Sequence, residues 1–145
     1  MPSRLVAFYI VLAWLGVFSF LPLVIFSQPP TDTLALKERI VKAEGKIWGN
    51  YPEEFKKAKS IYSEAKNSDC VKCKYRVEFM MGKYYWANGL YAKGSDYFRI
   101  GLRGALRAKD TLVIGYCYHY LAVTHYYQAY YDSAFHYYQK AYDVL

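Results

Sequence analysis

The chain has 145 residues, enough for one modest domain, and it carries a formal net charge of +7. Aromatic residues make up 20% of it, and 18 of them are tyrosines. This composition excludes a generic disordered tail, and the moderate positive charge is more often a sign of solvated lysines on helix faces than of a nucleic-acid partner.

The N-terminal segment differs from the rest of the chain. Residues 5–26 form a run of 22 residues without a charge, long enough to cross a bilayer as a helix. The run also has the layout of a secretory signal, with Pro22 near its end and Ser27-Gln28 as a candidate cleavage point, although it has no A-x-A site. We therefore expect residues 1–27 to be either a signal peptide or a membrane anchor.

The position of Arg4 before this run predicts where the rest of the chain lies. A basic residue ahead of an apolar segment favours an N-terminus that stays inside the cell. With either a signal peptide or an anchor, the chain from Gln28 onward is expected outside the cytoplasm. It would be periplasmic or secreted after cleavage, and anchored in the inner membrane through residues 5–26 without it.

The residues after the N-terminal segment are predicted to form helices joined by short turns. Residues 28–33 contain Pro29 and Pro30 and are expected to form a linker. Beyond it the apolar residues recur every three to four positions, which predicts an all-α fold. Pro52, the Asn88-Gly89 pair and Asp110 mark helix ends. The predicted helices cover residues 34–49, 52–67, 72–88, 91–108, 111–129 and 131–145.

Small and aromatic residues recur at a constant spacing along these helices. One set comprises Gly82, Tyr85, Gly94, Phe98 and Gly101. A second set follows 40 residues later and comprises Ala122, His125, Ala134, Tyr138 and Ala141. Small residues allow two helices to cross closely, and aromatic residues fill the space beside the crossing. We therefore assign a packing role to both sets.

This pattern resembles the tetratricopeptide repeat, in which small and aromatic residues alternate in this way over a helix–turn–helix unit. The resemblance covers residues 34–145 and implies a helical-repeat solenoid of about three units, over residues 34–67, 72–108 and 111–145. The first unit departs from the pattern, because Lys46 stands where the others have Gly82 and Ala122.

The same resemblance implies a binding surface. In this family the first helix of each unit lines the inner face of the array. The corresponding candidate partner-binding residues are Arg76, Phe79, Lys83, Trp86, Tyr116, His119, Val123 and Tyr126. Together they would form an aromatic groove with a basic side, suited to an extended or helical peptide that carries some negative charge.

The layout also resembles the N-terminal extracytoplasmic repeat regions of Bacteroidota-type signalling proteins, in segments such as SQPPTDTLALKERI and YYDSAFHYYQKA. That resemblance implies a non-catalytic module that binds a protein or peptide, as the sensor part of a larger signalling protein. The alternative is a membrane-anchored structural subunit of a larger complex.

Catalytic and metal-binding patterns are not evident in the sequence. Cys70 and Cys73 form a C-x-x-C pair that suits a disulfide outside the cytoplasm, with unpaired thiols or a redox or metal role as alternatives. Haem attachment would need His where Lys74 stands, and a zinc site would need two more ligands. We expect neither a cofactor nor an enzymatic activity.

Two surface patterns remain. Arg99, Arg103 and Arg107 recur every four residues along one predicted helix. They form either a stripe that binds an anion or nucleic acid or, as we favour, a solvated helix face. The last predicted helix carries an aromatic stripe formed by Tyr131, Phe135, Tyr138 and Tyr142. Because repeat arrays normally end in a polar capping helix, we expect further repeats or a partner to cover this stripe.

Overall fold

The computed structural model describes residues 32–47 and 51–145, and the predicted signal or anchor segment lies outside them. The described residues form six helices and no strand, so the predicted all-α fold is confirmed for this part. The helices are α2 (Thr33–Gly45), α3 (Tyr51–Asn67), α4 (Val71–Ala87), α5 (Tyr91–Ala108), α6 (Thr111–Tyr127) and α7 (Tyr131–Val144). None of these helices is both long and apolar enough to cross a lipid bilayer.

The helix ends follow from local capping. The carboxylate of Asp32 accepts hydrogen bonds from the backbone N–H groups of Leu34 (2.9 Å) and Ala35 (3.2 Å), and α2 therefore begins one residue before the predicted start. The same helix ends at Gly45, earlier than predicted. Asp110 caps α6 through a 3.3 Å bond from the N–H of Val113.

The turns after α4 and α6 have the same backbone geometry. Gly89 and Ala129, which are 40 positions apart, both adopt a left-handed conformation, with φ values of 73° and 62°. The N–H of Gly89 donates to the carbonyl of Trp86 at 3.0 Å, and that of Ala129 donates to Tyr126 at 3.0 Å. The spacing found in the sequence is thus repeated in the backbone hydrogen bonds.

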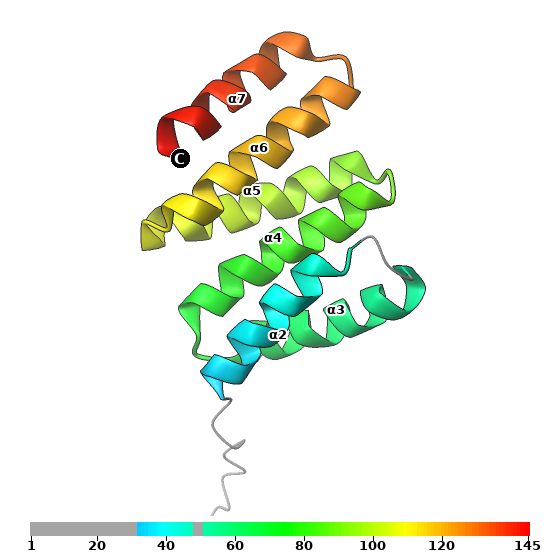
Figure 1. Cartoon of the computed structure of the whole chain (residues 1–145), viewed down its shortest axis with the longest axis vertical. Helices are drawn as coiled ribbons and strands as arrows, with labels where there is room; N and C mark the ends of the chain where they lie inside the picture. Colours follow the sequence, from blue (N-terminus) through cyan, green and yellow to red (C-terminus); the bar gives the residue numbers. More distant parts are fainter. Residues whose placement is uncertain (1–31, 48–50) are drawn as a thin grey trace, which may run out of the picture. The chain divides into compact units, whose positions relative to one another are not determined.

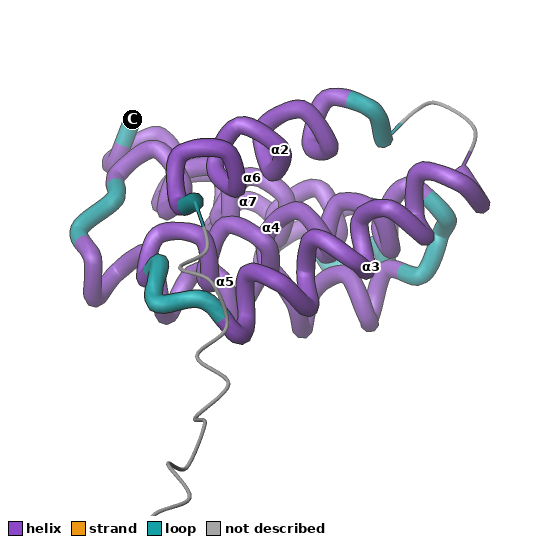
Figure 2. Tube along the Cα trace, turned by 90° about the horizontal axis from the view of Figure 1, so that it is seen from below, coloured by secondary structure: helices purple, strands orange, loops and turns teal. Residues whose placement is uncertain are grey.

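The helices follow one another along the long axis of Figure 1, from α2 and α3 to α7 at the C-terminal end. Helix α4 is central and packs against α2, α3, α5 and α6, whereas α7 packs against α6 alone among the described helices. In Figure 2, α2 and α5 lie on opposite sides of α4. One hydrophobic core lies among α2, α3 and α4, and a second among α4, α5 and α6.

Close contact between α4 and α5 depends on glycines. A Cβ atom added at Gly94 would lie 3.1 Å from the carbonyl oxygen of Gly82. A Cβ atom at Gly101 would lie 3.2 Å from the backbone of Phe79 and of Tyr75. Larger residues at either position would push the two backbones apart.

Candidate binding surfaces

The predicted binding residues on α4 are largely engaged in contacts within the chain. The guanidinium of Arg76 donates to both carboxylate oxygens of Glu44 on α2, at 2.8 and 3.3 Å. Although burial lowers the pKa of Arg76, the hydrogen bonds and charge of Glu44 raise it overall. This bidentate pair joins α2 to α4. The side chain of Arg76 therefore links two helices of the chain in place of the predicted contact with a partner.

Lys83 makes a second link between the same two helices. Its ammonium donates to the backbone carbonyl of Glu44 at 3.2 Å. It also lies 5.7 Å from the ring centroid of Phe79 and 5.8 Å from that of Tyr120. Burial lowers the pKa of Lys83, while the nearby carboxylate of Glu44 opposes that shift.

The aromatic members of the α4 set pack against α5 and α6. Phe79 is buried, and its ring lies 5.8 Å from that of Phe98 and 5.6 Å from that of Tyr120. Trp86 contacts the rings of Tyr120 and Tyr127, at 5.6 and 6.0 Å. The structure nevertheless brings Phe79, Lys83 and Tyr116 together around a hollow of 320 Å³ that Glu44 also lines.

The predicted residues on α6 are more accessible than those on α4. Tyr116, His119 and Tyr126 are exposed, and Val123 is half-buried. Tyr116 and His119 line a larger groove between α6 and α7, with a volume of 920 Å³. The other residues along this groove are Tyr138, Ala141, Tyr142, Asp143 and Leu145.

The positions assigned to repeat packing are buried with two exceptions. Half-buried His125 stacks on Tyr137, with ring centroids 5.3 Å apart and planes 10° apart. Tyr138 is 39% exposed, while its equivalent Phe98 is fully buried. The buried members are Gly82, Tyr85, Gly94, Phe98, Gly101, Ala122, Ala134 and Ala141.

The exposure of Tyr138 extends along one side of α7. At the spacing of 40 residues, Tyr138, Tyr142 and Leu145 correspond to Phe98, Leu102 and Ala105 of α5, which belong to the core that α6 helps to form. Tyr142 is 82% exposed and Leu145 68% exposed, and the neighbouring Phe135 is 72% exposed. Helix α7 therefore presents to solvent the side that α5 presents to α6.

The two paired cysteines lie at the start of α4. Their sulfur atoms are 2.05 Å apart, as in a disulfide between Cys70 and Cys73. The third cysteine, Cys117, is buried in α6, and burial raises the pKa of its thiol to about 12. Within the described ranges no three His, Cys, Asp or Glu side chains are grouped so as to hold a metal ion.

Comparisons of the chain with protein-family models, with curated proteins and with solved structures find no match. Its function is therefore inferred from the surfaces described above. Of the predicted binding positions, Tyr116 and His119 on α6 line the groove beside the exposed side of α7. The sequence indicated the aromatic stripe of α7, but not that Asp143 and Leu145 would complete a groove with Tyr116 and His119 of the preceding helix.

Proposed function

We propose that the chain is a non-catalytic helical-repeat module of the tetratricopeptide type, and that it binds a helical segment of a partner protein in the groove between α6 and α7. One observation carries this proposal. The side of α7 formed by Tyr138, Tyr142 and Leu145 is exposed, although the corresponding side of α5 is covered by a helix. Exposed apolar side chains that adjoin one another on a helix face are typical of an interaction site.

The contact between α5 and α6 indicates what kind of partner fits. Helix α6 covers α5 with apolar residues that lie four positions apart, namely Val113, Cys117 and Leu121, all of which are buried. A partner helix that takes the same place on α7 would present apolar residues at i, i+4 and i+8. This is the pattern by which amphipathic helices bind hydrophobic grooves.

Polar groups at the edge of the groove would orient the partner. His119 and Asp143 both line it, and the ring of His119 lies 5.8 Å from that of Tyr138. A basic or amide side chain of the partner next to its apolar stripe would pair with Asp143. Such edge contacts contribute more to specificity than to affinity.

We further propose that this module lies outside the cytoplasm, as a sensor or scaffold. The apolar run at residues 5–26 supports this, and so does the Cys70–Cys73 pair, because disulfides persist mainly in oxidising compartments. The intact mass of the protein from soluble and membrane fractions tests the proposal. A soluble form that lacks residues 1–27 would indicate a secreted module, a full-length membrane form would indicate an anchored subunit, and a full-length cytoplasmic form would contradict the proposal.

The binding proposal is tested by selecting from a displayed library of helical peptides on the full-length chain in a neutral detergent. The selected peptides are expected to share apolar residues at i, i+4 and i+8 and to compete with one another. Selected peptides that lack a helical apolar spacing would contradict a helix-binding groove. So would binding that persists equally in a Tyr138→Ser/Tyr142→Ser variant.

A further inference from the structure

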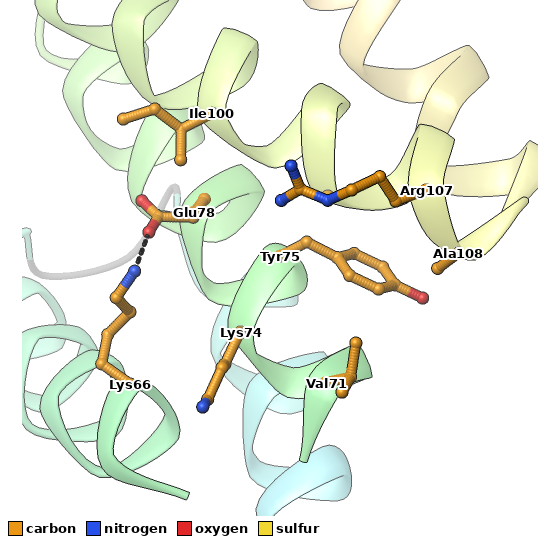
Figure 3. Close-up of a pocket in the computed structure, with 9 residues that line it drawn as sticks. Lys66, Val71, Lys74, Tyr75, Glu78, Ile100, Arg107 and Ala108 are labelled. Atoms are coloured by element: carbon orange, nitrogen blue, oxygen red, sulfur yellow. Dashed lines mark hydrogen bonds and ion pairs between the residues drawn. The ribbon is translucent and has the colours of Figure 1, made fainter. Parts of the chain in front are cut away.

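Another hollow lies on a different part of the molecule, among α3, α4 and α5, and the helix groove does not account for it. It has a volume of 320 Å³, at the lower end of the range for ligand-binding clefts. Three basic side chains and one carboxylate line it, those of Lys66, Lys74, Arg107 and Glu78. They come from three different helices, so the fold, and not one sequence motif, brings them together (Figure 3).

The negative charge of the single carboxylate in this pocket is already balanced by a lysine. The buried side chain of Glu78 accepts a 2.8 Å bond from the ammonium of Lys66, and the hydroxyl of Tyr62 donates to its two oxygens at 3.2 and 3.3 Å. Figure 3 shows the Lys66 ammonium pointing to Glu78 across the pocket. Glu78 therefore has little remaining capacity to attract a cation, and it does not compensate the other basic groups.

Arg107 and Lys74 supply the positive charge that remains. Neither forms an ion pair or a side-chain hydrogen bond with any residue in the described part of the chain, whereas Lys72 pairs with Asp110 at 3.2 Å and Arg99 with Asp96 at 3.5 Å. In Figure 3 the Arg107 side chain extends from α5 toward the α4 side of the pocket. A guanidinium with free donors is well suited to a carboxylate or phosphate group.

The rest of the pocket wall is apolar and held in place. The hydroxyl of Tyr75 donates to Asp110 at 2.9 Å, which fixes the ring. Ile100, which is 40% exposed, lines the pocket at its other end, near Glu78 (Figure 3). Gly104 allows this approach of α4 and α5, because a Cβ atom there would lie 2.5 Å from that of Tyr75. A ligand in this pocket therefore meets positive charge and an apolar surface together.

We propose that this pocket binds a small organic anion, in which a carboxylate or phosphate group contacts Arg107 and an attached aryl or short acyl group lies against Tyr75 and Ile100. The Arg107 end of the basic stripe on α5 thereby has a specific role, while Arg103, one turn earlier, does not line the pocket. This site does not depend on the helix groove, and either can fail without the other.

Phenyl phosphate is the probe, titrated calorimetrically into the full-length chain in a neutral detergent. Inorganic phosphate and benzyl alcohol test the anionic and the apolar halves of the ligand separately. Phenyl phosphate is expected to bind more tightly than either, and Arg107→Gln is expected to weaken it by about tenfold or more, as loss of a charge-assisted hydrogen bond does. The matched Arg103→Gln variant removes the same charge from the same helix and should change the affinity by less than about twofold.

Three results would overturn the proposal. The first is the absence of binding by phenyl phosphate at millimolar concentration. The second is equal weakening by Arg107→Gln and Arg103→Gln, which would show a general charge effect in place of a pocket. The third is binding of inorganic phosphate or benzyl alcohol as tight as that of phenyl phosphate. That result would mean that one ligand does not contact the basic and the apolar side chains of the pocket at the same time.

Discussion

The ring of Phe98 lies against Gly82 so closely that no side chain fits between them. A Cβ atom at Gly82 would be 2.5 Å from Cδ1 and from Cε1 of the ring, which is fully buried. We expect Gly82→Ala to lower the free energy of unfolding by about 1–3 kcal/mol, as overpacking does. Urea unfolding of the variant and of the wild type measures this difference in free energy.

Gly45 in α2 is the matched control for this substitution. A Cβ atom there would meet nothing within 4 Å. Gly45→Ala is therefore expected to raise the free energy of unfolding, by about 0.5–1 kcal/mol, because alanine loses less backbone entropy in a helix. Equal effects of the two substitutions would show that Phe98 does not restrict position 82.

Ala129 is a non-glycine residue in a left-handed conformation, with φ at 62°. The equivalent position after α4 is Gly89, which carries no such penalty. We expect Ala129→Gly to raise the free energy of unfolding by about 1 kcal/mol. The reverse change, Gly89→Ala, is expected to lower it by a similar amount. Thermal unfolding of the two variants checks this, and a destabilised Ala129→Gly would contradict it.

Asp110 joins the start of α6 to α4. Its carboxylate accepts hydrogen bonds from the Tyr75 hydroxyl at 2.9 Å and from the N–H of Val113 at 3.3 Å, and it pairs with Lys72 at 3.2 Å. Asp110→Ala is expected to cost about 1–2 kcal/mol through loss of the helix cap alone. Asp96→Ala, which removes an exposed pair with Arg99, is the control and should change stability little.

The carboxylate of Asp110 also makes the stability of the fold depend on pH in the acidic range. Although burial raises the pKa of Asp110, the bonds from Tyr75, Val113 and Lys72 bring it below its usual 3.8. The unfolded chain therefore binds a proton at Asp110 more readily than the folded chain does. The stability that the Asp110 carboxylate contributes is complete above pH 3.8 and is lost as the pH falls below that value. Acid unfolding followed by circular dichroism should be less steep in Asp110→Ala. An unchanged profile would contradict the linkage.

His125 gives a second pH dependence, nearer to neutral. Burial lowers the pKa of His125 from its ordinary 6.5, and the charge of Arg99 lowers it further. Protonation thus favours the unfolded chain, so the contribution of His125 is complete above pH 6.5 and is lost as the pH falls. His125→Gln should flatten the fall in melting temperature between about pH 7 and 5. His136→Gln, at an exposed position of α7, is the matched control, and equal flattening in both variants would contradict the role of His125.

The sequence was informative wherever a feature depends on local spacing. The positions of Gly82, Gly94 and Gly101 predicted where helices approach, because close contact needs small residues at a helical period. Helix ends at Asp110 and Gly89 were predictable from capping chemistry for the same reason.

The candidate site was less predictable, because it depends on contacts between distant parts of the chain. Arg76 and Lys83 have the pattern of accessible basic residues, but both bind Glu44 of α2, more than 30 positions away. Phe79 and Tyr116 share the predicted inner face, yet Phe79 is buried while Tyr116 remains exposed. Only the three-dimensional arrangement shows which aromatic residues are covered by a neighbouring helix.

The most direct test of the proposed function is the dissociation constant of a selected helical peptide, measured by fluorescence anisotropy on three forms of the full-length chain. We expect Tyr138→Ser/Tyr142→Ser to weaken binding by at least about tenfold, as loss of central aromatic contacts does. The control Leu34→Ser/Val71→Ser removes two exposed apolar side chains outside the groove and should bind as the wild type does. Equal dissociation constants for all three forms would contradict a binding site on α7.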